Sequence, residues 1–322
     1  MNKYVCQTAL TLLLGVVSTA SMAQRRVEPV AYGNMDQWLV RQVEESLIIG
    51  GNTKLLYEVA PTDTIISNDA YKNLGGSPWA TSNVLAKVGV TKTNTSVFSE
   101  PRGDGYCARL ETRIETCVVL GIVNIKVLAA GSMYLGTVHE PITDTKNPQS
   151  KLGTGIPFTK KPAGVTFDYK VKLTGEPDRI KRTGFGRASI VKGQDCPEVN
   201  VLLQKRWEDA EGNLFAKRIG TAVVRYTEST NNWVNAAEYP ILYGDITNNA
   251  AFKPYMGLIK GESTRFSLNS KGKSVPVTEV GWGNATDTPT HMILQFTSSH
   301  GGAYIGSPGN TLWVDNVGLI YE

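Results

Sequence analysis

Apolar and polar side chains alternate along three well-separated segments of this 322-residue chain. In residues 165–173 every odd position is apolar, whereas the opposite face carries charged residues such as Asp168 and Lys170. Residues 106–113 and 313–321 alternate in the same way. Successive side chains of a strand point to opposite faces of a sheet, so these patterns predict β-strands with one buried face.

Turn residues separate many further short apolar segments, since the chain contains 32 glycines and 15 prolines. An apolar run at residues 118–130 predicts a buried pair of strands. Further strands are predicted at 188–192, 199–207, 221–227, 233–242, 277–282 and 291–298. Strands without long helical patterns predict an all-β protein built as a two-sheet β-sandwich.

The chain has neither an internal repeat nor a composition shift that would indicate a linker. Its length suits one large all-β domain or two smaller ones. We therefore predict a single domain over residues 35–322, preceded by a polar, flexible lead-in at residues 24–34.

The first 23 residues have the pattern of an export signal. Lys3 supplies the positive charge, residues 9–17 the apolar segment, and Ser21-Met22-Ala23 a small-residue cleavage site. Cleavage near Ala23 would release a periplasmic or extracellular protein. No later apolar run is long enough to predict a transmembrane helix.

Removal of the signal would leave Cys107, Cys117 and Cys196, an odd number for an oxidising compartment. One disulfide would fit, with Cys107–Cys117 the more local pairing. Three unpaired thiols fit equally well, and the sequence leaves both readings open.

Composition and motifs exclude several function classes. Charged residues make up 19% of the chain and the net charge is +4, which does not indicate nucleic-acid binding. His139, His291 and His300 are scattered, without the spacing of metal ligands. No nucleophile elbow, phosphate loop or dinucleotide fingerprint is present. No strand carries the alternating acids from which a glycosidase could take its two carboxylates.

Three separated motifs resemble one known family. They are the Gly/Pro-rich loop 75–83 around Trp79, the Gly-Ile-Pro-Phe-Thr segment 155–159 with the strand that follows it, and the C-terminal segment 298–321. Together they resemble the putative carbohydrate metabolism domain of exported bacterial proteins. The resemblance implies a jelly-roll sandwich like that of carbohydrate-binding modules, and a poly- or oligosaccharide as partner.

Sugar rings stack on flat aromatic side chains, and their hydroxyl groups bond to amides, carboxylates and guanidinium groups. The predicted carbohydrate-binding residues are Trp79, Asn83, Arg109, Glu111 and Trp282. Because no catalytic pair is recognisable, we predict glycan binding without cleavage. The alternatives are a glycoside hydrolase or lyase with an unrecognised carboxylate pair, and a structural or adhesive module without a sugar site.

The resemblance also implies a structural calcium ion, which such modules bind with an Asp of the last strand and residues near the first. Asp315 and Asp36 are the matching acids. The alternative is that Asp315 accepts backbone N–H bonds from the turn at 306–310. No other cofactor is predicted.

Overall fold

A computed structural model describes residues 25–322 except 74–75, 121–122 and 144–146. The predicted export signal lies outside the described residues. Within them, the helical elements are four 3-10 turns at Leu47–Ile49, Pro148–Lys151, Pro254–Met256 and Gly261–Ser263. No helix in the described part of the chain is long and apolar enough to cross a membrane. The all-β prediction is confirmed.

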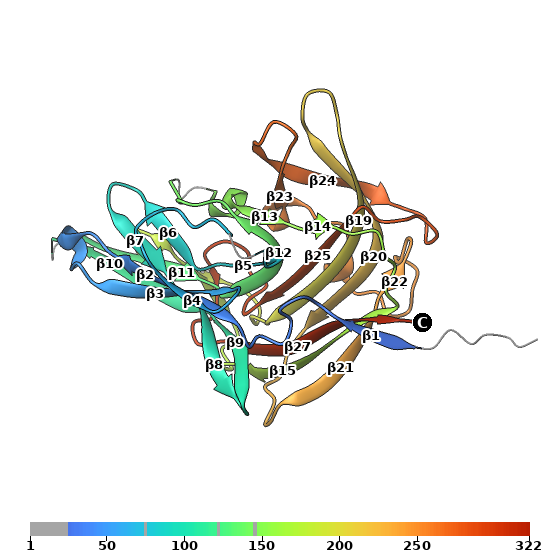
Figure 1. Cartoon of the computed structure of the whole chain (residues 1–322), viewed down its shortest axis with the longest axis horizontal. Coiled ribbons are helices and arrows are strands. Elements are labelled where there is room, and N and C mark those ends of the chain that lie inside the picture. The colour runs from blue at the N-terminus through green and yellow to red at the C-terminus, as the bar shows by residue number, and fades with distance from the viewer. Residues whose placement is uncertain (1–24, 74–75, 121–122, 144–146) are drawn as a thin grey trace, which may run out of the picture.

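Two large sheets lie face to face (Figure 1). The smaller contains, in spatial order, β21 (Val234–Pro240), β15 (Gly164–Lys172), β27 (Thr311–Tyr321), β9 (Gly105–Glu111) and β8 (Val97–Arg102), with β1 (Arg26–Pro29) also paired to β27. The larger contains β14 (Ile156–Pro157), β25 (His291–Thr297), β19 (Glu198–Glu208), β20 (Leu214–Arg225), β24 (Ser274–Trp282), β23 (Arg265–Leu268), β13 (Leu152–Thr154), β12 (Ser132–Val138) and β5 (Trp79–Thr81), with β22 (Leu242–Tyr243) paired to β20. The predicted β-sandwich is confirmed.

The chain crosses repeatedly between these sheets. In one sheet β9, β27, β15 and β21 are neighbours, and in the other β12, β25, β19 and β20 are neighbours. Along the chain, β9 is followed by β12, β15 by β19, β20 by β21 and β25 by β27, so each of these steps changes sheet. The chain therefore alternates between the two sheets of the sandwich.

The larger sheet also returns to its own starting strand. β12 pairs with β25 through residues 132–134 and with β13 through residues 136–138. From β13 the pairing continues through β23, β24, β20 and β19 back to β25. A closed ring of strands results, which curves the sheet around its outer face, the face turned away from the sandwich core.

Smaller sheets extend the molecule beside this sandwich. They are β2 (Trp38–Glu44), β3 (Thr53–Val59) and β4 (Asp63–Ile66); β6 (Val84–Lys87) and β7 (Thr91–Asn94); β10 (Arg113–Val119), β11 (Val123–Ala129) and β17 (Thr183–Gly184); and β16 (Arg179–Lys181), β18 (Ser189–Val191) and β26 (Ile305–Gly306). β10, β2 and β3 lie at the end of the molecule farthest from β21 (Figure 1).

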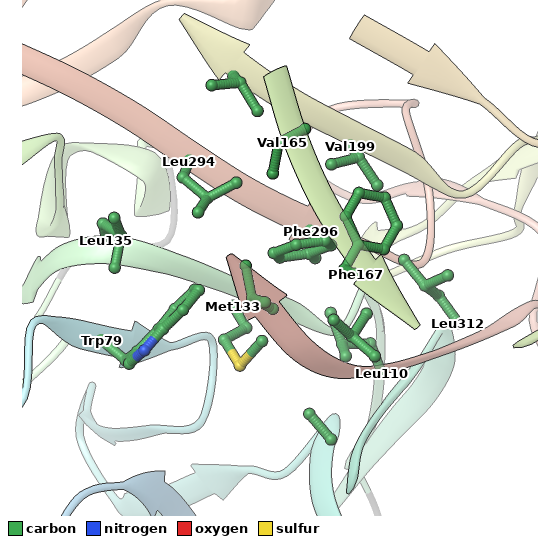
Figure 2. Packing of buried hydrophobic residues seen from close by; sticks show 14 of the residues in the cluster. Trp79, Leu110, Met133, Leu135, Val165, Phe167, Val199, Leu294, Phe296 and Leu312 are labelled. Carbon is green, nitrogen blue, oxygen red and sulfur yellow. The ribbon is translucent and has the colours of Figure 1, made fainter. Parts of the chain in front are cut away.

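The main core fills the space between the two large sheets (Figure 2). Phe167 of β15 meets Phe296 of β25 edge to face at 5.1 Å, an arrangement that adds to the stabilisation from burial alone. Met133 and Trp79 continue this cluster toward β12 and β5.

Two predictions about local structure are wrong, and the question of a disulfide is decided. Residues 24–34 were expected to be flexible, but Arg26–Pro29 form β1, which pairs with β27 in the register Arg26 to Tyr321. The polar composition reflects an exposed strand rather than a loose segment. The pair β10 and β11 was expected to be buried, yet Val118 and Val123 are exposed at its tip. All three described cysteines are free, so the unpaired reading holds.

Candidate functional site

Trp79, the predicted stacking platform, belongs to the hydrophobic core. Its side chain is 2% exposed and its indole N–H donates to the Ala31 carbonyl at 2.8 Å. The ring lies 6.3 Å from that of Phe296 (Figure 2). The Gly/Pro loop delivers Trp79 into β5, which pairs with β12, so the residue faces inward and cannot meet a sugar.

Asn83 is also fully buried, and its amide is used by the fold. It donates to the carbonyls of Tyr57 and Val97, and its oxygen accepts the N–H groups of Ser96 and Val97. Asn83 therefore connects three segments of backbone and has no free donor or acceptor for a ligand.

Arg109 and Glu111 lie on β9 of the smaller sheet, where they bond to each other at 2.5 Å. Arg109 also forms an ion pair with Glu100 at 2.8 Å and covers the ring of Phe98. Trp282 lies at the end of β24 in the larger sheet, packed against a small apolar cluster that includes Ile293. The structure therefore does not bring the five predicted residues together.

Asp315 and Asp36 do not converge on a cation site. Asp315 accepts from Arg102 at 2.5 Å and from the N–H of Asn316 at 2.7 Å, not from the turn at 306–310. Asp36 accepts from Tyr106 N–H and Asn34. The guanidinium of Arg102 supplies the positive charge that calcium would supply. Among the described residues no three Asp, Glu, His or Cys side chains are placed to hold a metal ion.

A different set of polar side chains lies on the outer face of the larger sheet. In β19, Val199, Val201 and Leu203 enter the core, so Glu198 and Asn200 face outward. The register places Arg225, Glu198, Thr297 and Ser132 in one row across four strands. The next row is Val223, Asn200, Gln295 and Tyr134. Residues opposite one another on neighbouring strands have Cβ atoms about 5 Å apart, so the two rows form one surface that is polar except at Val223.

These rows line a cleft of 790 Å³, within the range of about 300–1,000 Å³ that small-molecule sites occupy. One wall is the outer face of the larger sheet. The other is built by β6, β7, β10 and β11, and residues 254–266 cover one end. The wall from β6 and β11 contributes apolar side chains, among them Val84, Ala86 and Val127, whereas the part of the cleft at β19 and β25, called here its polar end, carries polar side chains.

Two ion pairs fix the polar end. Glu198 accepts from Arg225 Nε at 2.5 Å and from Asn200 at 2.7 Å, so both its oxygens are bonded. Glu279 accepts two bonds from Arg218, at 2.6 and 2.5 Å. The Arg225 guanidinium also lies 4.5 Å from the centre of the Tyr255 ring, which is 37% exposed beside the cleft.

Three side chains of the cleft, Asn94, Gln295 and Arg265, have a buried polar atom without a partner among the described residues. Gln295 is 7% exposed, and its amide oxygen is buried without a hydrogen bond. The Nε of Arg265 is likewise buried without a hydrogen bond to any described residue. An unpartnered buried polar group costs about 1–3 kcal/mol, so folding alone does not explain these side chains.

The carboxylates among the described residues of the cleft are Glu198 and Glu115. Burial raises the pKa of Glu115, against the opposing charges of Lys92 and Arg113. His300 also lines the cleft, and burial together with the charge of Arg225 lowers the pKa of its imidazole, against the opposing charge of Asp195.

The sequence did contain a signal for this site. Residues 198–206 alternate, with polar side chains at Glu198, Asn200, Gln204 and Arg206, although the strand is buried on both faces. Polar residues on a doubly buried strand indicate a lined cleft or a buried network. No comparable signal marks Arg265 or Tyr255, because their place depends on how residues 254–266 fold over the sheet.

Comparison with known proteins agrees with the resemblance seen in the sequence. The family model described as putative carbohydrate metabolism domain matches residues 56–320. The chain belongs to this family. No curated protein matches it.

Two solved structures are similar at low identity, both described as putative glycoside hydrolases. One, from Bacteroides vulgatus ATCC 8482, is 15% identical with a TM-score of 0.41, over 91% of this chain and 94% of its own. The other, from Bacteroides thetaiotaomicron VPI-5482, is 17% identical with a TM-score of 0.41, over 84% of this chain and 81% of its own.

Proposed function

We propose that this member of the putative carbohydrate metabolism domain family binds a poly- or oligosaccharide in the cleft, outside the cytoplasm, without cleaving it. The observation that carries the proposal is the unpartnered amide oxygen of Gln295, buried in a row of polar side chains at the base of the cleft. A sugar hydroxyl group would donate a hydrogen bond to this oxygen and so give it the partner that it lacks.

The rim of the cleft supplies the flat surfaces that sugar rings need. Phe185, which is 74% exposed, and Tyr255 both belong to the lining of the cleft. The bonded pair Glu198–Arg225 and the Asn200 amide present further donors and acceptors to hydroxyl groups. Aromatic rims over an amide-rich base support sugar binding.

The state of Glu198 favours binding over hydrolysis. A glycosidase needs one carboxyl group to donate a proton and a second to attack or to activate water. Both oxygens of Glu198 are bonded to Arg225 and Asn200, which holds it as a structural anion. Glu115 lies on β10, in the wall opposite the larger sheet, and its Oε2 is as far as 4.0 Å from Lys92 Nζ.

Hydrolysis is the second candidate, because Glu115 and Glu198 share one cleft and the pKa of Glu115 is raised by burial. Release of reducing ends from a bound glycan, abolished by Glu115→Gln, would favour it. We expect no release from any glycan that the protein binds.

Binding is tested with a glycan array followed by calorimetry on the protein lacking residues 1–23. Gln295→Leu should weaken binding at least tenfold without loss of stability, because it removes an unpaired polar group. Tyr255→Ala should cost about 1–2 kcal/mol of binding free energy through the loss of one stacking surface.

Trp207→Ala is the matched control, since Trp207 is an exposed aromatic stacked on Phe215 away from the cleft. It should leave affinity unchanged. Equal loss in the control and the cleft variants, or wild-type affinity in Gln295→Leu and Tyr255→Ala, would remove the cleft as the binding site. Export is tested separately by fractionation of cells that express the full chain.

A further inference from the structure

The positive groups of the cleft outnumber the negative ones. Its described lining contains Lys92, Arg218, Arg225, Lys260 and Arg265 against the carboxylates of Glu115 and Glu198. Three of the five cations have acidic partners: Lys92 with Glu45 at 2.8 Å, Arg218 with Glu279, and Arg225 with Glu198. Arg265 and Lys260 are left without one among the described residues.

Arg265 is the more informative of the two because its Nε is buried without a hydrogen bond to any described residue. It begins β23, the strand that residues 254–263 lead into, and Nη1 donates to the Ser263 carbonyl at 3.1 Å. Burial lowers its pKa, and the charge of Glu198 opposes this effect, so the guanidinium lies near the polar end of the cleft. Its Nε, a buried N–H without an acceptor among the described residues, costs about 1–3 kcal/mol of stability unless a ligand supplies the acceptor.

Arg225 adds a second guanidinium to the same end. Its Nε bonds to Glu198, whereas Nη1 and Nη2 have no bond to any described residue. Guanidinium groups are suited to planar or tetrahedral anions, which they bind through two N–H groups at once. The amide of Gln295 and the hydroxyl groups of a sugar would complete such a contact.

We propose that the cleft selects glycans that carry an anionic substituent, a carboxylate or a sulfate ester, and that Arg265 binds this substituent with Arg225 beside it. This inference rests on the proposed glycan-binding function and names the class of sugar. The Nε of Arg265 gains an acceptor only when the ligand binds, and an anionic acceptor bonds to a guanidinium more strongly than a neutral hydroxyl group, which gives acidic glycans their advantage over neutral ones.

The test compares matched acidic and neutral glycans by calorimetry. Homogalacturonan oligomers are compared with their methyl-esterified forms, and chondroitin sulfate with unsulfated and with carboxyl-reduced chondroitin, within an array of both classes. We expect the acidic member of at least one pair to bind at least tenfold more tightly, with the advantage falling as salt rises from about 0.05 to 0.5 M. The pair that responds identifies the substituent.

Arg265→Gln should abolish the tenfold preference and leave binding of the neutral member, while Arg265→Lys restores part of it. Arg265→Met should raise the melting temperature, because it removes a buried N–H donor that has no acceptor. The control is Arg26→Gln, which replaces an exposed arginine of β1. It should change neither the preference for the acidic glycan nor the melting temperature.

Equal binding of acidic and neutral members overturns the inference but leaves glycan binding intact. So does a preference that Arg265→Gln does not alter, or a fall in melting temperature for Arg265→Met. An array in which no glycan binds overturns both the inference and the proposed function.

Discussion

Two arginines of this protein, Arg102 and Arg265, have opposite surroundings. Arg102, from the smaller sheet, donates to Asp168 at 2.8 Å, to Asp315 at 2.5 Å and to Asn235 at 2.7 Å, and covers the ring of Trp233. Arg265, in the cleft, donates to the Ser263 carbonyl, and its buried Nε has no partner among the described residues. A satisfied charge holds a fold together, whereas an unsatisfied one indicates a missing ligand.

The largest effect is expected from Arg102→Gln. It leaves Asp168 and Asp315 facing each other without a cation and should lower the free energy of unfolding by about 2–4 kcal/mol, since Arg102 is partly exposed. Urea unfolding measures this loss. Glycan affinity should be unchanged. If the variant is as stable as the wild type, a full set of hydrogen bonds does not show that an arginine stabilises this fold.

A pH effect is expected from a third arginine, Arg41, which two carboxylates share. Glu140 takes two of its N–H groups at 3.0 and 2.6 Å, and Glu58 only one at 3.1 Å. Burial therefore prevails over Arg41 at Glu58 and raises the pKa of this carboxyl from 4.5 to about 8.

The folded protein retains a proton on Glu58 that the unfolded chain releases near pH 4.5. The contribution of protonated Glu58 to the free energy of unfolding is therefore complete below pH 4.5 and is lost as the pH rises through about 8. Thermal unfolding of wild type and Glu58→Gln between pH 4 and 9 checks it. The melting temperature of the wild type relative to that of Glu58→Gln should decline as the pH rises across this interval. A constant difference in melting temperature would contradict the raised pKa of Glu58.

The smallest effect is expected from metal removal. Arg102 already neutralises Asp315, so a chelator should leave the melting temperature unchanged. A fall in melting temperature with chelator, reversed by calcium, would restore the calcium site that the family resemblance implied at Asp315 and Asp36.

The sequence allowed the sandwich to be predicted but not the site. Period-two alternation in residues 165–173 reports directly which side chains are buried, and a sheet protein follows from it. The same pattern does not report which buried face meets another sheet and which meets a cleft. Trp79 illustrates the limit, since a Gly/Pro loop delivers an aromatic equally well to a rim or to the core.

Asp315 shows a second limit. Its alternation with Val317 correctly placed a carboxylate among buried positions, and the need for a partner was correct as well. The partner, Arg102, comes from a strand more than two hundred residues earlier in the chain. Pairings over such separations follow from the strand order, and no local pattern contains them.

The closed ring of the larger sheet also constrains how the protein folds. Met133 of β12 pairs with Phe296 of β25, so the ring cannot close until nearly the whole chain is available. Contacts between residues so far apart carry a large loop-closure entropy and slow the folding reaction. The cleft should therefore be among the last features to form, and a fragment ending before β25 should be unable to assemble it.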